Sequence, residues 1–176
     1  THSKITMVVR REDDAIRRYV HLATGNYNGK TAKIYTDCGI FTCNDEYGED
    51  ASSFFNVISG YSDPPLWNKF IVAPLNLREK IMAHIDEEIG HAERGEEAYI
   101  IAKMNSLLDK KVIAKLYEAS SKGVTIDLIV RGICTLRPGI PGVSDNIRVR
   151  SIVGRFLEHH RLFYFKHGGK DSVFLS

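Results

Sequence analysis

The stretch AYIIAKMNSLLDKKVIAKLYEASSKGVTIDLIV, residues 98–130, carries the clearest structural pattern in this 176-residue chain. Residues 98–103 are rich in apolar and β-branched side chains and predict a strand. Residues 110–121 have the spacing of a helix with one apolar face, and Gly123 is placed to end it. The run 124–130 is apolar enough for a buried strand of a parallel sheet. A strand, a helix and another strand in succession predict an α/β layered domain.

The same alternation continues on both sides of this stretch. Residues 70–73 are predicted to form a strand, and residues 77–94 a long helix with an apolar face. The Pro- and Gly-rich run 137–142 predicts a loop. Two further strands are expected after it, at residues 148–153 and 161–165.

The first sixty residues have a pattern of their own. Residues 4–10 and 18–23 are apolar and β-branched and flank a charged turn, so they predict a hairpin. The run 24–29 is dense in turn residues and leads to a third expected strand, 34–42. The apolar residues of 46–58 recur at helical spacing, which predicts a helix that closes this unit.

The best linker candidate is Ser62-Asp63-Pro64-Pro65. Two adjacent prolines disfavour the continuation of either a helix or a strand ladder. We therefore place a domain boundary near Asn68, which divides the chain into residues 1–68 and 69–176.

Composition excludes several classes of protein. With 43% hydrophobic and 26% charged residues, the chain is neither disordered nor a collagen-like fibre nor a disulfide scaffold. Its 24 basic and 22 acidic residues give a net charge of +2, too near neutral to indicate a nucleic-acid partner, so any anion site must be local.

The absence of membrane and signal segments and the pattern of cysteines predict a cytoplasmic protein with reduced thiols. No run approaches the ~20 apolar residues of a membrane span, and no signal peptide is apparent. The three cysteines are odd in number and lack CxxC spacing, which argues against a disulfide framework or a zinc site. The chain begins without Met and stops inside a strand-like run at 173–176, so we expect a fragment of a longer protein.

Two histidines each stand two residues before a cation. His2 precedes Lys4 and His159 precedes Arg161, so in an extended chain each pair points to one face. A histidine beside a fixed cation can attack phosphorus while the cation neutralises the phosphoryl oxygens. Two facing pairs would provide a nucleophile and a general acid/base, although this short pattern also occurs by chance.

Several arginines could bind anions near these pairs. Arg131 follows the predicted strand 124–130, at the carboxyl end where α/β sheets bind ligands. Arg148, Arg150 and Arg155 add guanidinium groups shortly before His159, and guanidinium suits planar phosphate recognition. The alternative is that these arginines are solvated or paired with Glu158 and Asp145.

The remaining histidines carry weaker signals. His84 and His91 lie seven residues apart on the predicted helix 77–94, with Glu87 and Glu88 between them. This differs from the H-E-x-x-H zinc motif, and it predicts a solvated helix face rather than a metal site. His167 is expected in a loop.

Long runs of the sequence resemble the carboxyl-terminal half of bacterial polyphosphate kinase of the first type. The runs are THSK at 1–4, YVHLATGNYNGKTAKIYTD at 19–37, LIVRG at 128–132 and SDNIRVRSIVGRFLEHHRLFYF at 144–165. They are far more specific than the histidine–cation pairs. The resemblance implies a phospholipase D-like fold, with a mixed sheet layered with helices. In this fold 1–68 would be the end of a first catalytic domain and 69–176 a truncated second one.

The resemblance also implies site residues and a reaction. His2 would be phosphorylated by the γ-phosphate of ATP and His159 would be the second catalytic histidine. Tyr35, Arg131 and His159 would contact the ATP phosphates, supported by the cations Lys4 and Arg161. The phosphoryl group would then pass reversibly to inorganic polyphosphate. Mg²⁺ is implied as a cofactor, with ligands upstream of Thr1.

The resemblance further implies a homo-oligomer and allows peripheral membrane association of the longer protein. The sequence differs from the phospholipase D pattern H-x-K-x4-D at one position, because that pattern would place an aspartate where Val9 stands. The alternatives are a phospholipase D-like phosphodiesterase or nuclease that uses the same histidines, and a non-catalytic module that binds polyphosphate. We expect the 176 residues alone to be inactive, because part of the first domain and the metal ligands would be missing.

Overall fold

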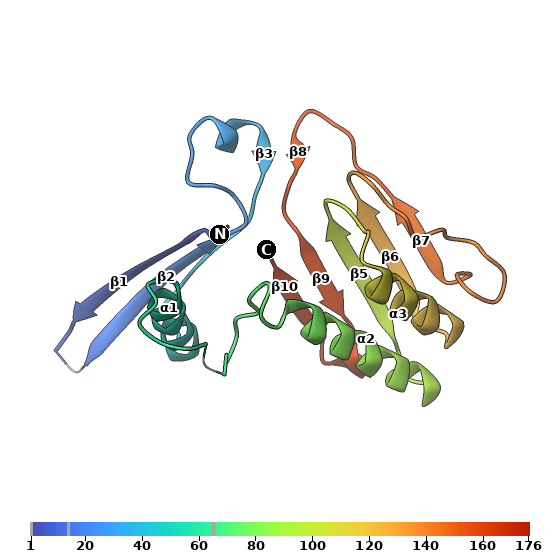
Figure 1. Ribbon diagram of the computed structural model, residues 1–176, viewed down its shortest axis with the longest axis horizontal. Coiled ribbons are helices and arrows are strands. Elements are labelled where there is room, and N and C mark those ends of the chain that lie inside the picture. The colour runs from blue at the N-terminus through green and yellow to red at the C-terminus, as the bar shows by residue number, and fades with distance from the viewer. Residues whose placement is uncertain (1, 14, 65) are drawn as a thin grey trace.

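The computed structural model describes residues 2–13, 15–64 and 66–176. Thr1, Asp14 and Pro65 lie outside the described residues, and with them the first residue of the THSK run, one residue of the hairpin turn and the last residue of the linker. The described chain folds into two units of sheet and helix, joined by a short third sheet (Figure 1). The predicted α/β class is confirmed.

A five-stranded sheet, as far as the chain is described, forms the larger unit in the order β10-β9-β5-β6-β7. The central strands β5, β6 and β7 run parallel, as the apolar run 124–130 predicts, while β9 and β10 are antiparallel to their neighbours. The sheet is therefore mixed. Its strands are β5 (Tyr99–Met104), β6 (Thr125–Val130), β7 (Ile147–Arg150), β9 (Leu162–Phe165) and β10 (Ser172–Leu175).

Helices α2 (Leu77–Glu93) and α3 (Lys110–Ser121) lie side by side along this sheet (Figure 1). Asp109 begins α3 by accepting the backbone N–H groups of Lys111 and Val112, an N-cap that satisfies two otherwise unpaired donors. The apolar helix faces and the inner face of the sheet form one buried core. Its members include Ile81, Ile85, Ile89, Leu116, Ala119, Ile100, Ile126, Leu128 and Phe165.

One part of α2 differs from the sequence-based expectation. The helix face that carries His84 and Glu88 was predicted to be solvated, but Glu88 is fully buried. Its carboxylate accepts the backbone N–H of Tyr99 at 3.0 Å and that of His167 at 2.7 Å. The two backbone donors offset the cost of burying the charge. Glu88 thereby ties α2 to β5 and to η2 (His167–Gly169), the short turn that carries His167 as expected.

The smaller unit contains the predicted hairpin, β1 (Ile5–Arg11) and β2 (Ile16–Ala23), with β4 (Gly39–Thr42) beside β2. Helix α1 (Asp45–Ile58) packs against β2, close to the helix predicted at 46–58. Asn44 begins α1 by accepting the N–H groups of Glu46 and Tyr47.

The third strand of this unit was predicted as one piece, 34–42, and the structure divides it. Residues 31–33 form a short 3-10 turn, η1 (Thr31–Lys33), followed by β3 (Tyr35–Thr36) and, separately, β4. A bend intervenes because the Thr24 hydroxyl accepts the Cys38 N–H at 3.0 Å and donates to Asp37 at 3.3 Å. β4 pairs with β2, whereas β3 pairs in parallel with β8 (Leu157–Glu158) of the other unit.

Two other predicted strands are also corrected. Residues 70–73 are irregular, because the backbone donors around Asn68 and Phe70 bond to side chains instead of to a sheet. The strand predicted at 148–153 ends at Arg150, beyond which the chain is exposed. No helix within the described residues is long and apolar enough to cross a membrane.

Asp50 is the acceptor for this irregular segment, and it carries a testable consequence. It is 2% exposed and accepts the backbone N–H groups of Asn68, Lys69 and Phe70 at 3.0, 2.6 and 2.8 Å. Asp50→Asn should lower the free energy of unfolding by about 2 kcal/mol, because an amide keeps one acceptor oxygen and turns an N–H group toward other donors. Urea unfolding measures this, and the exposed Asp63→Asn should change stability by less than about 0.5 kcal/mol. Equal stabilities would contradict the assigned role of Asp50.

Candidate functional site

The short parallel sheet of β3 and β8 brings the two units together at one point. Leu157 donates its N–H to the carbonyl of Ile34 at 2.7 Å, and Tyr35 pairs with Leu157. This register places the Tyr35 ring against His159, with ring centroids 4.8 Å apart. His2 and Ser176 also come together here, because both line the pocket at this point.

A pocket of about 450 Å³ opens where these segments meet, and we call it the β3–β8 pocket. It brings together five of the six residues singled out in the sequence as site candidates, and only Arg131 is not part of its wall. The described wall contains two histidines and two cations and no carboxylate. Its residues are His2, Ser3, Lys4, Ala23, Thr24, Asn26, Tyr35, His159, Arg161 and Ser176.

His159 has a defined protonation pattern. Arg161 can only donate, and its Nη1 lies 3.3 Å from Nε2 of His159 and 2.9 Å from the His159 carbonyl oxygen. Nε2 therefore accepts and Nδ1 carries the proton of the neutral ring. Nδ1 is buried and has no hydrogen-bond partner. A buried donor without a partner is a place where a ligand oxygen would gain a hydrogen bond.

Electrostatics keep this ring neutral. Burial lowers the pKa of His159 below the usual histidine value, and the positive charge of Arg161 lowers it further. The charges of Arg131 and Lys4 act in the same direction, and the carboxylate of Asp37 opposes them. At neutral pH the ring is thus an N–H donor among cations rather than a cation itself.

Arg131 directly follows β6, as predicted, and is not among the residues of the pocket wall. Its Nη1 is buried without a hydrogen-bond partner. Burial lowers the pKa of Arg161, and the charge of Arg131 lowers it further, so this charge acts on the pocket. Several cations without a matching carboxylate in the wall form a local positive field in a nearly neutral protein, and such a field suits an anion.

Behind His159 lies a polar group of residues that sequence reasoning missed. Lys103 on β5 is 7% exposed, and its Nζ lies 2.9 Å from the Glu158 carboxylate and 3.0 Å from Nε2 of His160. Thr36 on β3 donates to Glu158 at 3.2 Å, and its carbonyl lies 3.0 Å from Nδ1 of His160. The hydrogen bond from Lys103 lowers the pKa of Glu158. This group joins β3, β5 and β8 directly beside His159.

Two of the arginines considered as phosphate ligands serve another purpose. Arg148 and Arg150 on β7 lie 3.1 and 3.4 Å from Asp127, a largely buried carboxylate on β6 that also accepts the Tyr99 hydroxyl. For these two arginines the expected partners, Glu158 and Asp145, were wrong, whereas the expected solvation is confirmed, because their side chains are 63% and 60% exposed. Asp127 could have been noticed as a lone acidic residue inside the apolar strand 124–130.

Comparison with known proteins now gives the family. Residues 1–64 match the family model "Polyphosphate kinase C-terminal domain 1", and residues 70–176 match "Polyphosphate kinase C-terminal domain 2". The chain belongs to the polyphosphate kinase family. The resemblance seen in the sequence is confirmed.

Individual polyphosphate kinases support this assignment along the whole chain. The enzymes of Halalkalibacterium halodurans and Bacillus cereus are 60% and 57% identical over 176 residues, all of this chain and 25% of each relative. The crystal structure of polyphosphate kinase from Porphyromonas gingivalis superimposes with a TM-score of 0.90 at 40% identity, covering all of this chain and 29% of that one. The chain thus spans about a quarter of the curated relatives it matches.

The residues present do not form a magnesium site in the β3–β8 pocket. Mg²⁺ prefers oxygen ligands, above all carboxylates and phosphates. The described wall offers only nitrogen cations, imidazoles, hydroxyls and an amide. The cofactor implied by the polyphosphate kinase family would therefore need ligands from its nucleotide or from residues outside this pocket.

Proposed function

We propose that this chain supplies the phosphoryl-transfer pocket of a polyphosphate kinase, which moves the γ-phosphate of ATP reversibly to inorganic polyphosphate through a phosphohistidine. The observation that supports this most is the wall of the β3–β8 pocket. His2 and His159 line one cavity together with Lys4 and Arg161, without a carboxylate among the described wall residues. An uncompensated positive cavity with a histidine nucleophile suits a phosphate chain.

In the first step, the lone pair of an imidazole nitrogen of His2 attacks the γ-phosphorus. A P–N bond forms while the bond from the γ-phosphorus to the β–γ bridging oxygen breaks, and ADP leaves with that electron pair. In the second step, a terminal oxygen of polyphosphate attacks the same phosphorus. The P–O bond forms, the P–N bond breaks, and His2 is restored.

His159 acts in both steps as a donor through Nδ1–H. The proton lies on Nδ1 because Arg161 occupies Nε2, and no protein acceptor takes it. We propose that it donates to the oxygen whose charge grows as ADP leaves, and to the incoming chain in the reverse direction. To act as a full acid, the ring must first take up a proton at Nε2, which displaces Arg161 from that nitrogen.

The remaining wall residues hold charge and geometry. The transferring phosphoryl group spreads negative charge over three oxygens, and Lys4 and Arg161 approach it from the two units. Tyr35 packs on His159 and limits the rotation of its ring. We propose that Tyr35 and Arg131 contact the ATP phosphates, and that Mg²⁺ arrives with the nucleotide.

The decisive test is labelling of the full-length protein that contains this chain with ATP carrying ³²P in the γ position. We expect label on the protein that is labile in acid and stable in base, as for phosphohistidine. Added ADP should remove it as ATP, and polyphosphate should remove it as longer polyphosphate. Release of inorganic phosphate without either transfer would favour a phospholipase D-like hydrolase. Binding of polyphosphate without label would favour a non-catalytic module.

The lowered pKa of His159 predicts how stability depends on pH. Because the folded ring binds protons less readily than the unfolded one, the unfolded state takes up more protons as pH falls through about 6.5. His159 therefore costs no stability above about pH 7.5 and destabilises the fold as the pH drops below 6.5. Urea unfolding at pH 7.5 and 5.5 should show a smaller acid loss for His159→Gln than for the unmodified protein. The same acid loss in both would contradict the lowered pKa.

A further inference from the structure

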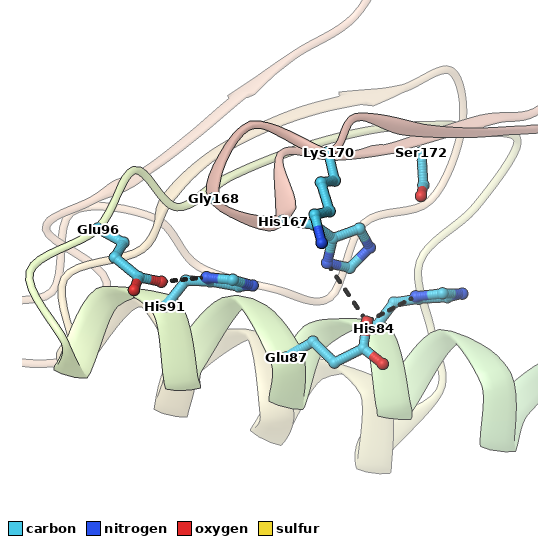
Figure 2. Close-up of a pocket in the computed structure, with 8 residues that line it drawn as sticks. All are labelled: His84, Glu87, His91, Glu96, His167, Gly168, Lys170 and Ser172. Atoms are coloured by element: carbon cyan, nitrogen blue, oxygen red, sulfur yellow. Dashed lines mark hydrogen bonds and ion pairs between the residues drawn. The ribbon is translucent and has the colours of Figure 1, made fainter.

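A second cluster of titratable side chains lies at the far end of the β9–β10 hairpin from the β3–β8 pocket. His84 and Glu87 stand on α2, and His167 stands on η2 opposite them (Figure 2). One ligand atom from each residue lies within 4.8 Å of the other two. From this geometry we propose that His84, Glu87 and His167 bind a divalent transition metal ion of the zinc class.

Two of the three ligand–ligand distances fit tetrahedral coordination, and the third, between the two histidines, is within 4.8 Å. The Glu87 Oε2 atom lies 3.3 Å from Nδ1 of His84 and 3.3 Å from Nδ1 of His167. For metal–ligand bonds of about 2.0–2.1 Å, two ligands at the tetrahedral angle are about 3.3–3.4 Å apart. Two imidazoles and one carboxylate form a donor set that zinc commonly takes, with a fourth position left for water.

His167 is the least satisfied member of the cluster. Its side chain is only 10% exposed, and both ring nitrogens are buried. Nδ1 lies 3.3 Å from the Glu87 carboxylate and 3.4 Å from that of Glu88 but forms no hydrogen bond to either, and Nε2 has no partner. A buried imidazole whose donor and lone pair form no hydrogen bond is costly. A metal ion on Nδ1 would satisfy the lone pair, and the nearby Glu88 carboxylate, 3.4 Å from the same nitrogen, would add favourable negative charge.

The ligands are held in place before any ion binds. The His84 ring stacks on Phe165 at 5.0 Å and lies tilted against Phe174 at 4.8 Å, and His167 stacks on Phe165 at 5.7 Å. The backbone N–H of His167 is fixed by Glu88. Aromatic packing and a fixed turn restrict ring rotation, which lowers the entropy cost of binding.

Other charged residues line the same pocket but are not proposed as metal ligands. The pocket there, about 500 Å³, is also lined by His91, Glu96 and Lys170. His91 is already engaged, since its Nδ1 lies 2.5 Å from Glu96, and Glu96 also accepts from Arg94. These contacts lower the pKa of Glu96 to about 2. Lys170 extends toward His167 in Figure 2, but its side chain is exposed and can turn outward when a cation binds.

A bound ion would tie η2 to α2 and so stabilise the β9–β10 hairpin. The two ends of this hairpin belong to two different sites. One end carries the proposed metal ligands, and the other carries Arg161 and Ser176 in the β3–β8 pocket. The role is structural and does not depend on the proposed phosphotransfer. Sequence spacing alone argues against a metal at His84 and His91, and the third ligand comes from 83 residues further along the chain than His84.

The test is titration of the chelator-treated full-length protein with Zn²⁺, followed by calorimetry, and with Co²⁺, followed by its ligand-field absorption. We expect tetrahedral Co²⁺ bands and zinc binding that Glu87→Gln and His167→Gln each weaken by about 10- to 100-fold. Because Glu87 is exposed, Glu87→Gln should fold normally even where His167→Gln does not. Zinc should raise the thermal midpoint of the unmodified protein and not that of Glu87→Gln.

His91→Gln is the matched control, since it removes an imidazole from the same helix and the same pocket, 6.2 Å from the His167 ring, and leaves all three ligands in place. Its zinc affinity should stay within about twofold of the unmodified protein, and Lys170→Met should bind zinc at least as tightly. The proposal is overturned if the unmodified protein binds no zinc, if Glu87→Gln binds it equally well, or if His91→Gln weakens binding as much as Glu87→Gln does.

Discussion

Replacing His2 by alanine in the full-length protein should abolish labelling from ATP and lower polyphosphate synthesis by about 10⁴-fold or more. His2 is the exposed histidine of the β3–β8 pocket, and under the proposed function it forms the P–N bond. No other described group in the wall can take over: His159 is neutral but holds its proton on the buried nitrogen, and its second nitrogen is occupied by Arg161. Without a nucleophile, binding and the cations remain, but the covalent step is lost.

Two variants separate this effect from general damage. His159→Ala should still accept label from ATP, but slowly, because it removes a donor and leaves the nucleophile. His91 lies on α2 and is not part of the β3–β8 pocket, so His91→Ala should keep full polyphosphate synthesis. Label that survives in His2→Ala and disappears in His159→Ala would reverse the assigned roles of the two histidines.

Glu158→Gln should lower the free energy of unfolding by about 3–5 kcal/mol, because it leaves the buried ammonium of Lys103 without its carboxylate. The Lys103 side chain is 8% exposed and that of Glu158 18%, so little solvent screens the pair. Glu158 also accepts from Thr36, and its loss would loosen the contact of β3 with β8 that places Tyr35 against His159. Activity should therefore fall together with stability.

The matched control is Glu97→Gln. Glu97 also pairs with a lysine, Lys166, at 3.6 Å, but its side chain is 80% exposed, and its removal should cost less than about 1 kcal/mol. Replacing both members of the buried pair, with Lys103→Met and Glu158→Leu, should recover a large part of the loss, because no charge is then left unpaired. Urea unfolding measures all three. A loss no larger for Glu158→Gln than for Glu97→Gln would contradict this account.

The local sequence pattern predicted helices and strands correctly where each element buries its own apolar face. The helix at 110–121 and the parallel strand at 124–130 follow directly from periodicity and apolar content. It failed where side chains compete for backbone groups. In the expected strand 70–73, Asp50 accepts the N–H of Phe70 and Asn76 accepts that of Val72. The Thr24 hydroxyl helps bend the chain near Cys38.

In the candidate site, too, some residues could be predicted from the sequence and others only from contacts between distant segments. The histidine–cation pairs predicted His2, Lys4, His159 and Arg161, and the family resemblance added Tyr35; the β3–β8 pocket contains all five. The buried pair of Lys103 and Glu158 carried no such signal, because the two residues are 55 positions apart. Arg148 and Arg150 looked like phosphate ligands, and only the neighbouring strand reveals their partner Asp127.

From its sequence alone, then, this protein is an α/β chain of the polyphosphate kinase family with two histidine–cation pairs, because periodicity and long shared runs are properties of neighbouring residues. The tertiary structure alone decided which distant residues come into contact, because strand pairing and helix packing join segments that are far apart in the sequence. The register of β3 with β8 seats Tyr35 on His159, and the turn after β9 brings His167 to His84 and Glu87. Such contacts form only when separate elements pack, so no local pattern encodes them.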